Sequence, residues 1–145
     1  MNKSIIHELS IGAVLFSFKY KKPYFLLLHY NSGHWDFPKG NKEKDETDQE
    51  TILREIREET GIVDIDIYDD FRKEVFYNYK RKKSLVSKEV IYFLAKTSKW
   101  DVILSKEHIG YKWESYSSAL EIITYENSRT ILRQAFDFIN QNIFF

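Results

Sequence analysis

Cysteine is absent from this sequence of 145 residues, so the chain forms no disulfide and offers no thiolate to a metal. It contains only two prolines and five glycines, and no apolar run reaches the roughly 18 residues that a membrane-spanning helix needs. Residues 1–8 contain no long apolar stretch, so no secretory signal is indicated either. We therefore expect a cytoplasmic protein with no membrane partner.

The formal net charge is zero, because 22 basic residues balance 22 acidic ones. A chain without an excess of positive charge has no general attraction for polyanions, so phosphate binding has to come from a local arrangement of side chains. No stable nucleic-acid partner is expected. The expected assembly is a monomer or a weak dimer.

Hydrophobic residues make up 43% of the chain and aromatic residues 17%, which is typical of a compact globular protein. No linker, repeat or low-complexity segment interrupts it, so we expect one domain over residues 1–145. The spacing of apolar residues predicts a mixed α/β domain whose helices cover a sheet. The expected strands are residues 11–20, 24–30, 63–70, 71–79, 89–95 and 111–114, with a turn at 21–23 and a basic loop at 80–87. The expected helices are residues 48–59, 117–124 and 127–139.

The segment 48–59 has well-formed helix ends but an unfavourable distribution of charge. Thr47 and Glu50 have the spacing of a capping box at its start, and Gly61 is a natural stop. Its last two turns carry three carboxylates, those of Glu55, Glu58 and Glu59. Like charges at this spacing, at the negative end of the helix dipole, cost about 1 kcal/mol together. The alternatives are a solvated acidic face or, as is typical of such a conflict, a functional site that holds a divalent cation.

The spacing of the longer segment favours the functional interpretation. Gly40 is followed after five residues by Glu46, and after seven more by the run Arg54-Glu55-Ile56-x-Glu58-Glu59-x-Gly61-Ile62. This 23-residue pattern resembles the Nudix box at each of its fixed positions. The resemblance implies an α/β/α sandwich with a mixed β-sheet. It also implies a hydrolase that acts on a nucleoside diphosphate linked to another group and depends on Mg²⁺ or Mn²⁺.

The resemblance also implies roles for single residues. The expected metal-binding positions are the Gly40 backbone carbonyl and the carboxylates of Glu55, Glu58, Glu59 and Glu107. Such oxygen ligands suit hard Mg²⁺. Arg54 is expected to fix a glutamate through a charge-assisted hydrogen bond, and Glu46 to brace the loop. The general base stays open between Glu58, Glu59 and Glu107. Many relatives have glycine where this chain has Asp45, a residue type that tolerates a left-handed backbone.

Features outside the Nudix box narrow the range of possible substrates. They are His34-Trp35 with Phe37-Pro38-Lys39-Gly40, the pair Tyr77 and Tyr79, the segments 88–95 and 107–113, and Tyr125. Over nearly the full length they are similar to the asymmetrical diadenosine tetraphosphate hydrolases of the animal and archaeal type. The similarity implies in-line attack of a metal-activated water on a bridging phosphate of diadenosine tetraphosphate, with ATP and AMP as products.

A tetraphosphate carries about four negative charges, so it needs fixed cations as well as the metal. Lys39 and Lys88 are the expected cations, with His34 as a hydrogen-bond donor. Adenine stacks on aromatic faces with ~1–3 kcal/mol per base. By the resemblance, Tyr77 and Tyr125 are expected near the nucleotide or phosphate chain. Further candidates are Tyr79 and Trp35 as stacking faces and Arg81, Lys82 or Lys83 as cations, although core packing and a solvated hairpin tip are the commoner roles.

Other functions stay open. One is hydrolysis of a capped or triphosphorylated RNA 5′ end, or of a nucleoside triphosphate, by the same chemistry. RNA is disfavoured because no continuous basic stripe extends beyond residues 80–83. The other is a non-catalytic nucleotide sensor, which is disfavoured because the acidic motif positions are intact. For His108, which adjoins Glu107, an internal role is favoured over contact with the substrate.

Overall fold

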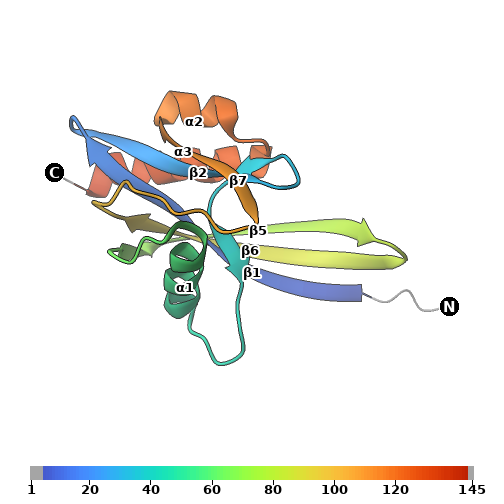
Figure 1. The fold of residues 1–145 in the computed structure, drawn as a ribbon. Coiled ribbons are helices and arrows are strands. Elements are labelled where there is room, and N and C mark those ends of the chain that lie inside the picture. Colours follow the sequence, from blue (N-terminus) through green and yellow to red (C-terminus); the bar gives the residue numbers. More distant parts are fainter. Residues whose placement is uncertain (1–4, 144–145) are drawn as a thin grey trace.

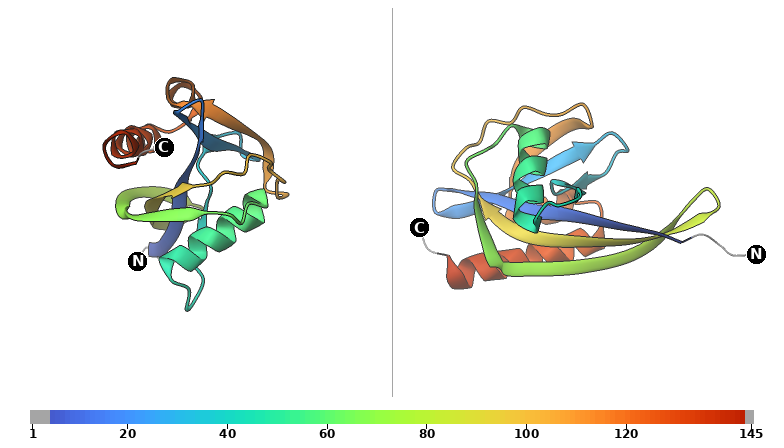
Figure 2. Two further views of the ribbon diagram at one scale, coloured as in Figure 1. Left: turned by 90° about the vertical axis from the view of Figure 1, so that its left-hand side faces the viewer. Right: turned by 90° about the horizontal axis from the view of Figure 1, so that it is seen from below.

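A mixed β-sheet separates helix α1 from helices α2 and α3, which lie against its other face (Figures 1 and 2). The computed structural model describes residues 5–143, so residues 1–4 and 144–145 of the expected domain lie outside the described residues. The elements are β1 (Ile5–Lys19), β2 (Lys22–Tyr30), β3 (Trp35–Asp36), β4 (Lys39–Asn41), α1 (Asp48–Thr60), β5 (Asp66–Arg81), β6 (Ser84–Lys96), β7 (His108–Ser115), α2 (Tyr116–Ile122) and α3 (Glu126–Asn142). The strand order is β3-β2-β1-β6-β5, with β4 paired to β1 and β7 to β2.

Strand β1 separates two hydrophobic clusters. Because successive side chains of a strand point to opposite faces, Ile11 and Leu15 pack in the cluster that contains Ile52 of α1. Val14 and Phe16 pack in the cluster that contains residues of α2 and α3. Strand β1 pairs with β6 in parallel and with β2 antiparallel, so the sheet is mixed. The predicted α/β/α arrangement with a mixed sheet is confirmed.

The three expected helices are present with small differences at their ends. Helix α1 begins after Thr47, whose side chain accepts from the Glu50 N–H at 3.1 Å, while the Glu50 side chain accepts from the Thr47 N–H at 2.9 Å. This capping box satisfies two of the free amides at the helix start. At the other end Gly61 has φ of 77° and donates its N–H to the Arg57 carbonyl. The local signals for this helix were therefore sufficient to predict its limits.

The expectations for residues 63–87 are wrong in their boundaries. Strand β5 is one element over Asp66–Arg81, with a register irregularity between Tyr68 and Arg72 in place of the break expected at residue 70. The expected basic loop 80–87 is a tight turn at Lys82 and Lys83, with β6 already beginning at Ser84. Charged residues have low intrinsic strand propensity, but pairing with a neighbouring strand overrides it on an exposed ribbon. The ribbon of β5 and β6 extends beyond the sheet's centre in Figure 1.

The start of the sheet also differs from the expectation. Strand β1 begins at Ile5 instead of residue 11, because its first residues pair in parallel with β6. The turn to β2 is formed by Tyr20 and Lys21, which both have positive φ, as a two-residue hairpin turn requires. Pro23, expected in this turn, lies near the start of β2, where a strand tolerates proline. The short strands β3 and β4 were not expected.

Among residues 5–143, no helix is long and apolar enough to cross a membrane. The expected cytoplasmic location stays a prediction, and so does the expectation of a monomer or weak dimer.

Candidate active site

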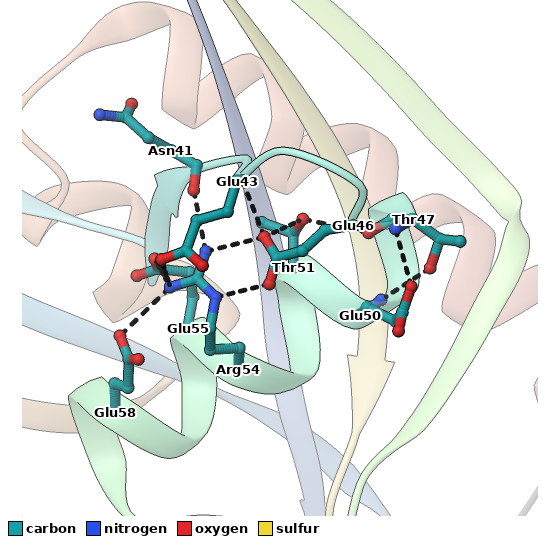
Figure 3. Close-up of polar contacts among 9 residues, drawn as sticks. All are labelled: Asn41, Glu43, Glu46, Thr47, Glu50, Thr51, Arg54, Glu55 and Glu58. Carbon is teal, nitrogen blue, oxygen red and sulfur yellow. Dashed lines mark hydrogen bonds and ion pairs between the residues drawn. The ribbon is translucent and has the colours of Figure 1, made fainter.

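Arg54 of helix α1 binds several acidic side chains at once (Figure 3). Its Nη1 donates to Oε1 of Glu55 at 2.6 Å and to Oε2 of Glu58 at 3.2 Å. Its Nε donates to Oε2 of Glu46 at 2.6 Å, and its Nη2 donates to the Asn41 carbonyl at 2.9 Å. The guanidinium fork allows these simultaneous contacts. Arg54 thus compensates the like-charge repulsion on this face of the helix.

The loop before α1 is held by Glu46. Its Oε1 accepts from the Glu43 N–H at 2.8 Å and from the Thr51 hydroxyl at 3.0 Å. Hydrogen bonds from Arg54 are the main reason that the pKa of Glu46 is lowered to about 2. These contacts agree with the bracing role expected for Glu46. Asp45 has φ of 70°, so aspartate adopts the left-handed backbone where relatives have glycine.

Gly40 lies directly against the carboxylate of Glu55. It belongs to β4 and pairs with Ile11 of β1. A Cβ atom at Gly40 would lie 2.0 Å from the Cδ atom of Glu55, so any side chain there would force the Glu55 carboxylate to move. The absence of a side chain therefore brings the main chain of β4 and a carboxylate of α1 to the same point. Burial raises the pKa of Glu55 above its ordinary value.

Glu59 is the most deeply buried carboxylate of the motif, with 3% of the residue exposed. Its Oε1 lies 3.3 Å from Nε2 of His108, and its Oε2 has no hydrogen-bond partner among the described residues. Burial raises the pKa of Glu59 to about 7, and the nearby carboxylates of Glu55 and Glu107 act in the same direction against His108. Glu59 is therefore a carboxyl group whose charge depends on its surroundings near neutral pH.

Two adjoining cavities contain the whole predicted site. The first, of ≈ 590 Å³, is called the acidic cavity and is lined by Gly40, Arg54, Glu55, Glu58, Glu59 and Glu107 together with Lys39 and Lys88. The second, of ≈ 610 Å³, is called the aromatic cavity and is lined by His34, Tyr77, Tyr79 and Tyr125, again together with Lys39 and Lys88. The two lysines therefore stand where the cavities meet.

The two shared lysines have different environments. Nζ of Lys39 donates to Oδ2 of Asp36 at 3.0 Å, and Asp36 is 1% exposed. Burial opposes the charge of Lys39, but the attraction of Asp36 outweighs it and raises the pKa of Lys39. Burial and the neighbouring Lys39 lower the pKa of Lys88. At the junction of the cavities, Asp36 therefore keeps Lys39 charged, whereas the surroundings of Lys88 disfavour its charge.

His34 belongs to a group of rings at the edge of the aromatic cavity. Its ring stacks on Tyr30 with 4.5 Å between centroids and lies 5.4 Å from the ring of Tyr125. Tyr30 donates its hydroxyl to the Phe37 carbonyl at 2.6 Å, which fixes the stack to the segment that leads into β4. Burial lowers the pKa of His34. A neutral ring can still donate one hydrogen bond, as expected for this residue.

The further candidates are not all near the cavities. Trp35 stacks on His29 at 4.3 Å, and the Lys112 ammonium lies 5.3 Å from its centroid, so this ring is engaged within the fold. Arg81 donates to Tyr79 and Glu8 instead of lining either cavity. Lys82 and Lys83 form the turn between β5 and β6 and line neither cavity.

The NUDIX domain family matches residues 6–135, so the chain belongs to the Nudix hydrolase family. The asymmetrical bis(5′-nucleosyl)-tetraphosphatase of Rattus norvegicus is 37% identical over 121 residues, which cover 79% of this chain and 80% of the rat protein. The protein of the same name from Caenorhabditis elegans is 34% identical over 128 residues, covering 85% and 90%. A crystal structure of a C. elegans Ap4A hydrolase binary complex has a TM-score of 0.82 and 31% identity, covering 92% of this chain and 98% of that chain. The expected Nudix fold is confirmed.

Nudix hydrolases generally use a divalent metal, and the acidic cavity fits one. Its donors are carboxylate and carbonyl oxygens, which suit Mg²⁺ or Mn²⁺. Oε2 of Glu59 is buried and without a partner among the described residues, and the lack of a Cβ at Gly40 lets the Glu55 carboxylate lie against the main chain of β4. Among residues 5–143, no three acidic, histidine or cysteine side chains already converge as a metal-binding group. Arg54 and His108 hold the carboxylates in their place.

Several contributors to the site had no local signal in the sequence. Asp36, Tyr30 and Ser105 each contact a predicted residue or line a cavity, and none was expected there. The spacing of Asp36 and Lys39 could have suggested an ion pair. The contact between His108 and Glu59 joins residues far apart in the chain, and only the fold brings them together.

Proposed function

We propose that this protein hydrolyses diadenosine tetraphosphate asymmetrically, with water as the second substrate and ATP and AMP as products. The observation that carries the proposal is the arrangement of the two cavities, which meet at Lys39 and Lys88. A dinucleoside polyphosphate needs a place for a base, cations along a phosphate chain, and an oxygen-rich centre for cleavage. The likeness to tetraphosphatases of rat and nematode supports the same substrate.

In the aromatic cavity, Tyr77 and Tyr125 are proposed to contact the nucleoside. Both are partly exposed, at 37% and 49%, so their faces are accessible to a ligand. Stacking on one base contributes ~1–3 kcal/mol, which is enough to orient the substrate without fixing it irreversibly. His34 is proposed to donate a hydrogen bond to the phosphate chain where it leaves this cavity.

At the junction, the ammonium groups of Lys39 and Lys88 are proposed to bind the bridging phosphates. Asp36 keeps Lys39 charged despite its burial, so this cation is available over the physiological pH range. Lys88 gives up its proton more readily than Lys39, because burial and the neighbouring Lys39 lower its pKa. Together they hold the chain so that one phosphoanhydride lies in the acidic cavity.

In the acidic cavity, Glu55, Glu58, Glu59, Glu107 and the Gly40 carbonyl would hold Mg²⁺ or Mn²⁺. When bound, the cation neutralises phosphate charge and lowers the pKa of water. Arg54 orients Glu55 and Glu58 by the hydrogen bonds described above. The proton of the attacking water passes to one of Glu58, Glu59 and Glu107, all of which line the cavity.

The test is product analysis by chromatography with the purified protein and Mg²⁺. Diadenosine tetraphosphate, an RNA with a 5′ triphosphate, and ATP are compared at equal concentrations. We expect ATP and AMP in equal amounts from the dinucleotide, at the highest rate of the three. The variant Glu58→Gln is the control: it should remain folded and turn over ~10²-fold more slowly, because metal-based charge stabilisation is reduced. Faster hydrolysis of the RNA end would replace the proposal by the RNA alternative.

A further inference from the structure

His108 is a fully buried polar side chain that the proposed reaction does not use. It is the first residue of β7, and 0% of its side chain is exposed. The ring of Tyr30 packs edge-on against it with 4.5 Å between centroids. Among the described residues its Nδ1 has a hydrogen-bond partner and its Nε2 has none, and an unpaired buried polar atom costs about 1–3 kcal/mol. Its two nitrogens face two different segments of the acidic cavity.

The two ring nitrogens of His108 contact Glu59 and Ser105. Nε2 lies 3.3 Å from Oε1 of Glu59, within ion-pair distance, and makes no hydrogen bond among the described residues. Nδ1 is hydrogen-bonded to the Ser105 hydroxyl, 2.9 Å away. The same hydroxyl oxygen accepts from the Glu107 N–H at 3.3 Å. The contacts thus connect the backbone of Glu107 with the side chain of Glu59.

The main chain supports the same connection. The Ser105 N–H donates to the Glu59 carbonyl at 3.4 Å, and the Ile103 N–H donates to the Thr60 carbonyl at 2.8 Å. The segment that carries Glu107 is therefore attached to the last turn of α1. The ring of His108 joins the two segments through a side chain as well. Oε2 of Glu59, the oxygen that His108 does not face, stays without a partner among the described residues.

We propose that His108 is a positioning residue, which holds one oxygen of Glu59 and, through Ser105, the backbone of Glu107, so that both carboxylates stay directed at one cation. The inference rests on the proposed function for the metal-binding role of these carboxylates. It adds a residue that contacts neither the substrate nor the cation. Partners that orient metal ligands typically change metal affinity 10–100-fold when removed, which is about the effect expected here.

The experiment measures Mn²⁺ binding by titration calorimetry on the substrate-free protein. His108→Leu removes both ring nitrogens, and His108→Gln keeps a donor near the position of Nε2. We expect the Kd for Mn²⁺ to rise about 10–100-fold in the leucine variant and to recover largely in the glutamine variant. His29→Leu is the matched control, because His29 stacks on Trp35 and lines neither cavity, and it should leave the Kd unchanged.

Thermal unfolding of each variant shows whether it is folded. If His108→Leu does not fold, Ser105→Ala breaks the same connection from its other side and should weaken Mn²⁺ binding in the same direction. Folded variants of His108 or Ser105 with the Kd of the wild type would overturn the inference, as would a wild type that binds no Mn²⁺. A wild type that binds Mn²⁺ but leaves diadenosine tetraphosphate intact would overturn only the proposed function.

Discussion

Arg54 donates a hydrogen bond of 2.6 Å to Glu55, its neighbour in the chain, and the same nitrogen reaches Glu58 one turn further on. The two carboxylates would repel each other without this cation. Replacing Arg54 by lysine keeps the positive charge but removes the guanidinium group, which can donate to several acceptors at once. We expect Arg54→Lys to lower the stability of the chelator-treated protein by about 1.5–3 kcal/mol, the usual range for hydrogen bonds to charged groups.

Thermal unfolding with EDTA and with Mg²⁺ checks this prediction. Mg²⁺ should recover part of the lost stability, because it supplies positive charge to the same carboxylates. Arg57→Lys is the control, since Arg57 is an exposed residue of the same helix. Equal melting temperatures for the wild type and Arg54→Lys in EDTA would contradict the prediction.

A methyl group at Gly40 should displace the carboxylate of Glu55, because the Cβ atom would lie 2.0 Å from Cδ of that residue. We expect Gly40→Ala to lower kcat by ~10²-fold, the typical cost of a displacement of about 1 Å in a catalytic group. The assay is steady-state hydrolysis of diadenosine tetraphosphate. Gly110→Ala should keep its activity, because a Cβ there meets its nearest atom at 3.6 Å. The same loss in both variants would show that the close contact with Glu55 is not the cause.

Lys88 should act on the phosphate chain more than on the base. Lys88→Ala removes a charged donor of about 1.5–3 kcal/mol, so KM for the tetraphosphate should rise roughly tenfold or more. A nucleoside monophosphate, tested as a competitive inhibitor, should lose less affinity. Lys83→Ala at the turn after β5 should leave both constants unchanged. An unaltered KM for Lys88→Ala would mean that this lysine is only solvated.

The buried carboxyl of Glu59 predicts a dependence of stability on pH. Burial raises its pKa from 4.5 to about 7, so the folded protein keeps a proton that the unfolded chain loses. The stabilisation from this group is complete below the ordinary pKa and is lost as the pH rises through about 7.

We therefore compare the metal-free wild type with Glu59→Gln by thermal unfolding at about pH 5 and about pH 8, on either side of the shifted pKa. The neutral amide should melt close to the wild type at the lower pH and above it at the higher pH. Added Mg²⁺ should reduce the difference at the higher pH by offsetting the buried charge. A difference independent of pH would contradict a raised pKa for Glu59.

Local patterns predicted the parts of the site that lie close together in the chain. The capping box, Gly61 and the helical spacing placed three glutamates on one helix, and the motif spacing brought Gly40 to them. Contacts between distant segments had no such signal. The pair of Glu59 and His108 depends on how β7 docks against α1. The length of the β5–β6 ribbon likewise depends on pairing with β1, which charged residues at 80–83 do not reveal.

The two cavities come from largely separate parts of the chain, with only the lysines in common. The aromatic one depends on β5, β6 and the start of α3, whereas the acidic one depends on α1, β4 and the segment before β7. Under the proposed function, substitutions in α3 or β5 would change which nucleobase is preferred and leave the residues proposed for hydrolysis unaltered. Sequence changes among related enzymes can thus alter one cavity almost independently of the other. Lys39 and Lys88 are the exception, because they line both cavities.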